Sequence, residues 1–66
     1  MRVTVNGKSH QVDDGTTVID LLRTAGVPEN YLAVEINDDV VPREQHATRT
    51  IHDGDRIEVV TLVGGG

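Results

Sequence analysis

Apolar and polar residues alternate at the start of the chain. Met1, Val3 and Val5 are separated by polar residues, which is the period of a strand with one buried face. Asn6-Gly7 follows at once and favours a type I′ hairpin turn, because both positions accept a positive φ. Two strands joined so tightly must be antiparallel neighbours, so Lys8 to Val12 is predicted to be the return strand.

A helical period replaces this alternation in the next segment. Apolar residues recur there at i, i+3, i+4 and i+7 and form one stripe: Val18, Leu21, Leu22 and Ala25. Thr16 or Thr17 can cap the N-terminus, while Gly26 and Pro28 end the helix. A helix of about nine residues is marginal by itself, so we expect its stripe to pack on a sheet.

The second half of the chain predicts three more strands. The alternation of Leu32, Val34 and Ile36 indicates the first, and the second is a short strand at residues 40–41 that Pro42 stops. The last is Arg56 to Val63. Residues 43–50 show no clear period and are predicted to form a loop with room for one helical turn, with Ile51 as a core residue beneath it.

The order of these elements predicts an α+β domain. A hairpin, one helix and further strands favour a single mixed sheet of four to five strands with the helix across one face. We expect the strand after the helix to lie beside the first hairpin. The last strand should run parallel to the first, because its β-branched residues suit a central position. Residues 1–66 are predicted to be one domain, with residues 64–66 as a flexible tail.

Composition excludes several classes of function. The chain has no cysteine, so neither a disulfide nor a thiolate metal site is expected, and His10, His46 and His52 lack close metal-ligand spacing. A net charge of −5 opposes binding to nucleic acid or to an anionic membrane surface. No segment approaches the roughly 18 apolar residues that span a bilayer. A cytoplasmic protein is the expectation.

The last predicted strand has two different faces. If Ile57 and Val59 face the helix, then Val60 and Leu62 lie on the uncovered face of the sheet. Aliphatic side chains exposed on the strand that leads to the tail would form a docking patch for a partner protein.

The chain closes on Gly64, Gly65 and Gly66, which bury no side chain and are costly to order. Extended, three residues reach about 10 Å and can thread a narrow tunnel to a buried active site. The carboxylate of Gly66, with an ordinary pKa of about 3.3–3.7, is an anion that needs activation before anything attacks it. Adenylation by ATP followed by a sulfur nucleophile is the usual remedy. Because cysteine is absent, a sulfur carrier of this sequence would hold sulfur as a thiocarboxylate on Gly66.

Several motifs together resemble one family. They are Val41-Pro42-Arg43-Glu44-Gln45, Asp53-Gly54-Asp55-Arg56-Ile57-Glu58, the short N-terminal hairpin and the Gly-Gly ending. The chain is similar over essentially its whole length to the ThiS sulfur carriers of thiamine biosynthesis, which have the ubiquitin-like β-grasp fold. It departs from them in His46, where members often have Trp, and in the third glycine, Gly64.

The resemblance implies a carrier and not an enzyme. A ThiF-like enzyme would adenylate Gly66, and a cysteine desulfurase or sulfurtransferase would supply the sulfur. The thiocarboxylate would then donate sulfur for the thiazole ring on a ThiG-like thiazole synthase. ATP and magnesium belong to the activating enzyme, so this chain is expected to bind no cofactor and to be a monomer when free. Gly64 and Gly65 would enter the active sites of these partners.

Some alternatives stay open. Arg43 and Glu44 are candidate partner contacts, because function concentrates in loops, but they are equally able to pair with each other or to cap the loop. The small subunit of molybdopterin synthase uses the same tail chemistry. A ubiquitin-like modifier would instead join the tail to lysines, and a binding module would carry an inert tail.

Overall fold

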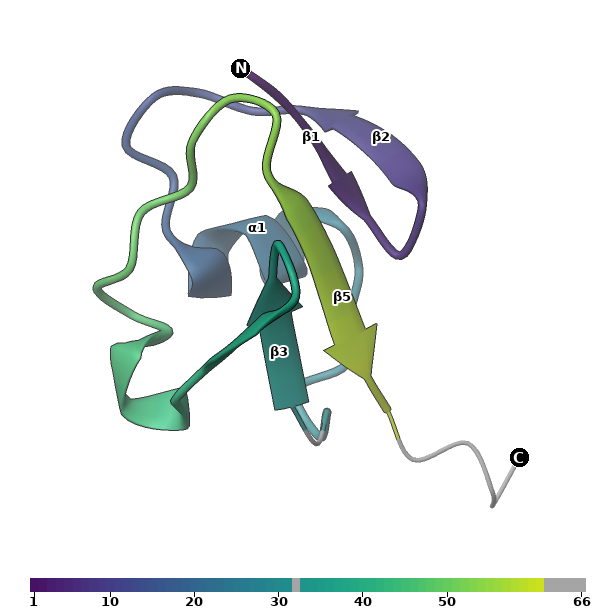
Figure 1. Ribbon diagram of the computed structural model, residues 1–66, viewed down its shortest axis with the longest axis vertical. Helices are drawn as coiled ribbons and strands as arrows, with labels where there is room; N and C mark the ends of the chain where they lie inside the picture. The colour runs from purple at the N-terminus through teal and green to yellow at the C-terminus, as the bar shows by residue number, and fades with distance from the viewer. Residues whose placement is uncertain (32, 62–66) are drawn as a thin grey trace.

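In the part of the chain that the structure describes, the fold is one mixed sheet with one α-helix across a single face (Figure 1). The computed structural model describes residues 1–31 and 33–61. The five strands lie in the order β2-β1-β5-β3-β4. The elements along the chain are β1 (Arg2–Val5), β2 (Lys8–Gln11), α1 (Val18–Thr24), β3 (Ala33–Ile36), β4 (Asp39–Val41), the 3₁₀ turn η1 (Arg43–Gln45) and β5 (Arg56–Val60). This is the predicted β-grasp.

The β1–β2 hairpin has the predicted turn. Asn6 and Gly7 have φ angles of 50° and 84°, as a type I′ turn requires. The two strands are antiparallel, with Val3 opposite His10 and Val5 opposite Lys8. A second two-residue turn of the same kind joins β3 to β4 at residues 37–38, where φ is 51° and 73°.

Helix α1 begins and ends at the predicted signals but is shorter than nine residues. Thr17 is the N-cap, and its side chain accepts a hydrogen bond of 3.3 Å from the backbone of Asp20. The seven residues of the helix end before Ala25, and Gly26 follows at a φ of 75°. Three residues of the predicted apolar stripe, Val18, Leu21 and Leu22, are at most 2% exposed, and the fourth, Ala25, is partly buried against the core.

Strand β5 occupies the centre of the sheet. It pairs parallel with β1 and antiparallel with β3, which confirms the expected central position beside the first strand. The prediction that β3 lies beside the hairpin is wrong, because β5 separates them. β1, β3 and β5 each contribute two buried β-branched residues, so this composition does not show which of the three lies in the middle; β3 pairs with β5 on one side and with β4 on the other.

A thin aliphatic core lies between the sheet and α1. Its most completely buried large side chains come from both layers and are Leu21, Leu22, Ile36, Ile57, Val3, Val18 and Val34. Ile51 is 2% exposed, which confirms it as a core residue beneath the loop. The backbone of that loop is tied to the start of α1 by bonds from Ile51 N to Thr16 O and from Val18 N to Arg49 O, both 2.9 Å long.

Within residues 1–31 and 33–61, no helix has the length and apolar content needed to cross a bilayer.

Candidate functional site

The tail-proximal end of β5 is the part of the described chain that lies nearest in sequence to Gly66, the predicted site of sulfur attachment. Val60 closes the strand and is 44% exposed, while Ile57 and Val59 are buried at 0% and 8%. The predicted division of the strand into a helix-facing and an uncovered face is therefore confirmed for these three residues. The strand ends at Val60, earlier than the predicted Val63. Leu62, Gly64, Gly65 and Gly66, on which other predictions fall, lie outside the described residues, as does Leu32.

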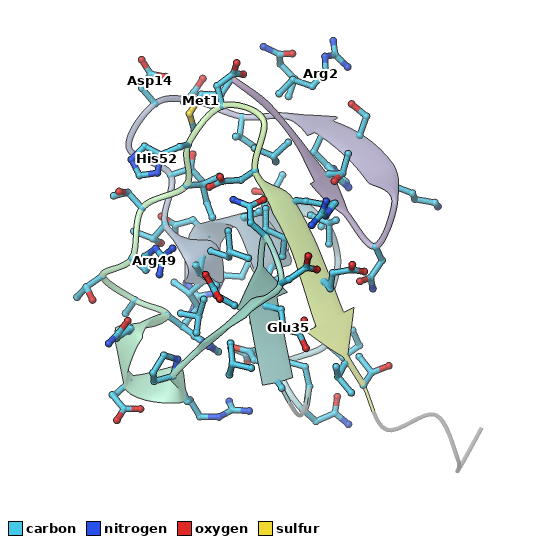
Figure 2. The ribbon with its side chains drawn as sticks, in the orientation of Figure 1. Met1, Arg2, Asp14, Glu35, Arg49 and His52 are labelled. Atoms are coloured by element: carbon cyan, nitrogen blue, oxygen red, sulfur yellow. The ribbon has the colours of Figure 1, made fainter. Side chains whose placement is uncertain are left out.

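The side of the sheet away from α1 combines apolar and acidic side chains. Its register places Val60 opposite Ala33, Glu58 opposite Glu35, and Glu35 opposite Val40. We call these five residues the uncovered sheet face. Val40 is 66% exposed, and Figure 2 shows Glu35 between β3 and β5. Two carboxylates directly opposite each other repel, and no ion pair between described residues includes either of them.

Asn6 connects the hairpin turn to the tail-proximal end of β5. Its side-chain oxygen Oδ1 accepts a hydrogen bond of 2.8 Å from Val59 N. Its Nδ2 donates to Val59 O at 3.4 Å, and its backbone N donates to Ile57 O at 2.9 Å. The asparagine-glycine pair in the sequence predicts the turn but gives no sign of this second role, which depends on where β5 lies.

Asn37 makes the corresponding contacts at the other end of β5. Its Oδ1 accepts from Arg56 N at 2.9 Å, and its Nδ2 donates to Asp55 Oδ1 at 3.0 Å. Its backbone N donates to Arg56 O at 2.8 Å. The two turn asparagines therefore hold β5 from opposite sides and at opposite ends.

Arg43 is engaged within the fold. Its Nη2 donates a 2.6 Å hydrogen bond to Tyr31 O, and the guanidinium carbon lies 4.7 Å from the centre of the Tyr31 ring. This geometry combines a charge-assisted hydrogen bond with a cation–π contact. Glu44 is exposed on η1, and no ion pair among the described residues joins it to Arg43. Their role in partner binding stays a prediction.

His46 is a structural residue of the core edge and is only 3% exposed. Its Nε2 lies 2.9 Å from Val41 O and its Nδ1 lies 2.9 Å from the Tyr31 hydroxyl. A carbonyl only accepts, so Nε2 carries the proton, and in the neutral ring Nδ1 accepts from the hydroxyl. This burial leaves little of the ring for a partner to contact. In the described part of the chain, no three His, Cys, Asp or Glu side chains gather as a metal site.

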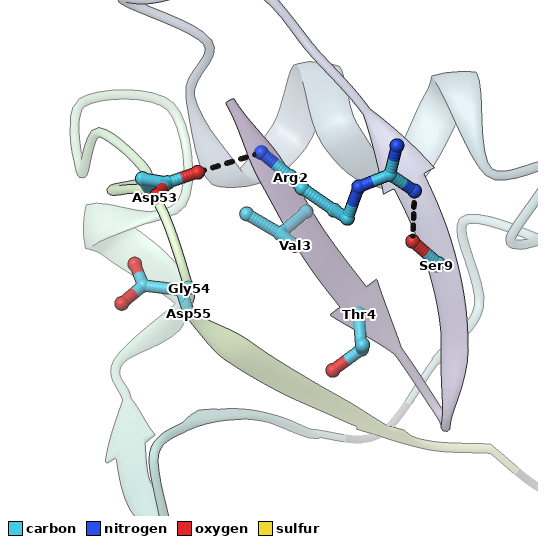
Figure 3. A pocket seen from close by; sticks show the side chains of 7 residues that line it. All are labelled: Arg2, Val3, Thr4, Ser9, Asp53, Gly54 and Asp55. Atoms are coloured by element: carbon cyan, nitrogen blue, oxygen red, sulfur yellow. Dashed lines mark hydrogen bonds between the residues drawn. The ribbon is translucent and has the colours of Figure 1, made fainter.

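An open hollow of about 320 Å³ lies at the other end of the sheet, between β1, β2 and the turn before β5 (Figure 3). Two hydrogen bonds join residues that line it: Arg2 N donates to Asp53 Oδ1 at 2.8 Å, and Arg2 Nη1 donates to Ser9 Oγ at 2.9 Å. Because Asp53 precedes the first residue of β5, the hollow is remote from the strand end that leads to the tail.

Comparison with known protein families shows which family the chain belongs to. The profile of the ThiS family matches residues 3–66. The chain belongs to the ThiS family. It is 35% identical to the sulfur carrier protein ThiS of Escherichia coli, and the match covers all of both chains. The crystal structure of thiamine biosynthesis protein ThiS from Geobacter metallireducens also matches over all of both chains, at 39% identity and a TM-score of 0.76.

Membership confirms the resemblance seen in the sequence. ThiS is a small sulfur carrier protein and not a catalyst, in agreement with the expectation that this chain is not an enzyme. The chain is also 36% identical to a segment of a thiazole synthase from Paramagnetospirillum magneticum, and 38% identical to a segment of another from Magnetococcus marinus. It spans 20% of the length of each of these two relatives.

Proposed function

We propose that this chain carries sulfur for thiamine biosynthesis as a thiocarboxylate on Gly66. The observation that carries the proposal is the match to the ThiS family over residues 3–66, which takes in the glycine run as well as the fold. Full-length similarity to the E. coli sulfur carrier supports the same role. A cytoplasmic location is part of the proposal.

The chemistry begins with activation of the terminal carboxylate. In a chain that ends at Gly66, a carboxylate oxygen attacks the α-phosphorus of ATP and pyrophosphate leaves, which makes an acyl adenylate. A sulfur nucleophile at the oxidation level of sulfide then attacks the acyl carbon and expels AMP, so that one carboxylate oxygen is replaced by sulfur. The chain supplies the acyl group only, and ATP and magnesium are bound by the activating enzyme.

Three kinds of partner follow from this sequence of steps. A ThiF-like enzyme adenylates Gly66, a cysteine desulfurase or sulfurtransferase provides sulfur, and a ThiG-like thiazole synthase takes it. Two proteins named thiazole synthase contain a segment similar to this chain, which supports a thiazole synthase as the partner that takes the sulfur. Gly64 and Gly65 enter the active sites of the partners, because glycine backbone fits a narrow passage.

Partners dock on the uncovered sheet face beside the tail. Val60, at 44% exposure, supplies apolar contact, and Leu62 follows it two residues along the chain. Glu44 and the exposed part of Arg43 extend the contact to η1. The acidic pair on the sheet face and the net charge of −5 favour a partner surface with basic side chains.

Intact mass spectrometry tests the proposal. After incubation with ATP, magnesium, a ThiF-like enzyme and a sulfur source, we expect a mass increase equal to one oxygen-to-sulfur exchange. Deleting Gly65 and Gly66 should abolish the increase and leave thermal unfolding unchanged, because neither glycine contributes a side chain to the core. An unchanged mass in the intact chain would contradict sulfur carriage, and attachment of the chain to other proteins would indicate a modifier instead.

A further inference from the structure

We propose that Asn6 is a positioning residue for the tail, because its side chain sets the point at which the chain leaves the sheet. This inference rests on the proposed function, since it concerns how Gly66 is presented to the activating enzyme. The observation behind it is the pair of hydrogen bonds between the Asn6 side chain and the backbone of Val59.

The side chain of Asn6 takes the place of a strand residue. The parallel pairing of β1 with β5 covers only Thr4 with Arg56 and Val5 with Ile57. After that, the main chain of β1 turns away at the type I′ turn. Alternate residues of a central strand point their N–H and C=O groups to the same side, so those of Val59 face the β1 side, as Ile57 O does. The amide of Asn6 accepts from one and donates to the other.

Strand β5 is therefore held on both sides up to its last residues. On the β3 side, the register pairs Val60 with Ala33. On the β1 side, the Asn6 side chain extends the hold by one step, to Val59. Residues 61–66 follow, and six residues reach at most about 20 Å when extended. If Val59 loses its hydrogen bonds on the β1 side, the end of β5 becomes less fixed. The activating enzyme must then restrict a larger number of chain conformations when it binds the tail.

Asn37 provides a matched control within the same strand. It is the same residue type at the first position of the same kind of turn, with a φ of 51° against 50° for Asn6. Its side chain also accepts one hydrogen bond from a β5 backbone N–H, that of Arg56. Arg56, however, begins β5 and lies at the end away from the tail. Replacement by glycine suits both positions, because glycine adopts a positive φ without strain.

The experiment compares Asn6→Gly with Asn37→Gly in the full chain. The activity measured is carrier-dependent exchange of pyrophosphate into ATP by the ThiF-like enzyme that loads the wild type. For Asn6→Gly, the KM for the carrier should rise about threefold to tenfold with a smaller change in kcat, because the added entropy is lost when the tail binds. Asn37→Gly should lose about as much stability as Asn6→Gly but should change the KM for the carrier by less than about twofold.

Two further readouts distinguish positioning from folding. Amide hydrogen exchange should accelerate at Val59 in Asn6→Gly and not in Asn37→Gly. Asn6→Asp keeps an oxygen that accepts from Val59 N–H, so its KM for the carrier should lie between those of Asn6→Gly and the wild type. Should Asn6→Gly fail to fold, Asn6→Asp replaces it, because it still loses the donor to Val59 O and should show a KM above that of the wild type and faster exchange at Val59. Equal KM values in the two variants, or unchanged exchange at Val59, would overturn the inference. A wild-type chain that no activating enzyme adenylates would contradict the proposed function itself, and the inference would fall with it.

Discussion

At the scale of single residues, the loop after β4 depends on one polar cluster. His46, Tyr31 and Arg43 connect the segment before β3 to the end of β4 and to η1. Every buried side-chain nitrogen or oxygen in the described part of the chain has a partner. This matters because a buried polar group without a partner costs about 1–3 kcal/mol. His46 thus stabilises the loop that carries Arg43 and Glu44.

We expect His46→Ala to lower the free energy of unfolding by about 1–3 kcal/mol, because it leaves the Tyr31 hydroxyl and Val41 O without their partner. Urea denaturation measures the change. His52→Ala is the control and should stay within about 0.5 kcal/mol, since the His52 side chain is 76% exposed. Similar losses in both variants would show that the buried hydrogen bonds of His46 contribute nothing.

The burial of His46 could not be predicted from the sequence. It lies between Gln45 and Ala47, and no hydrophobic period marks its position. Its partners, Tyr31 and Val41, come from other parts of the chain, so the bonds exist only once β3 and β4 have paired. The same reason hides the roles of Asn6 and Asn37, whose turn-forming character alone is visible locally.

At the scale of elements, β5 buries one face in the core and exposes Val60 on the other. Its alternation of buried and exposed residues was predictable, because the period of a strand is local. Its end at Val60 and its place between β1 and β3 depend on pairing with distant strands. This explains why the predicted position of β3 is wrong, since a sequence pattern shows that a strand exists but not which strand it pairs with.

The two faces of β5 predict opposite outcomes for one substitution. Val60→Asp should reduce stability by less than about 1 kcal/mol, because Val60 is 44% exposed, but should weaken binding to the activating enzyme at least about fivefold. Val59→Asp, one residue earlier and 8% exposed, should unfold the protein by burying a charge. Circular dichroism and titration calorimetry measure the two effects. Loss of folding in Val60→Asp would place that residue in the core.

The facing carboxylates of β3 and β5 predict a stabilising substitution. Glu58→Gln should raise the free energy of unfolding by about 0.2–1 kcal/mol, because it removes repulsion with Glu35 directly opposite. The gain should shrink at high salt, where the repulsion is screened. Denaturation at low and high ionic strength checks both statements, with Glu44→Gln, on η1 outside the sheet, as the control. A loss of stability in Glu58→Gln would show that the carboxylate is favourably placed.

At the scale of the whole molecule, the fold class was predictable and the geometry of the site only partly so. The helix stripe, the hairpin turn and the exposed position of Val60 follow from local patterns. The acidic pair on the uncovered sheet face does not, because Glu35 and Glu58 are 23 positions apart and meet only through the register of β3 with β5. The proposed role of Gly66 rests on the chemistry of a terminal carboxylate and on the resemblance to ThiS.

The central place of β5 also has a consequence for synthesis. The ribosome makes this strand after every other element of the sheet, yet β5 alone joins the β1–β2 hairpin to the β3–β4 hairpin. A polypeptide that terminates prematurely, before Arg56, holds two hairpins without the strand between them, and isolated hairpins are at best marginally stable in water. We therefore expect a fragment that ends before Arg56 to stay unfolded, so the sheet can form only after β5 has been made.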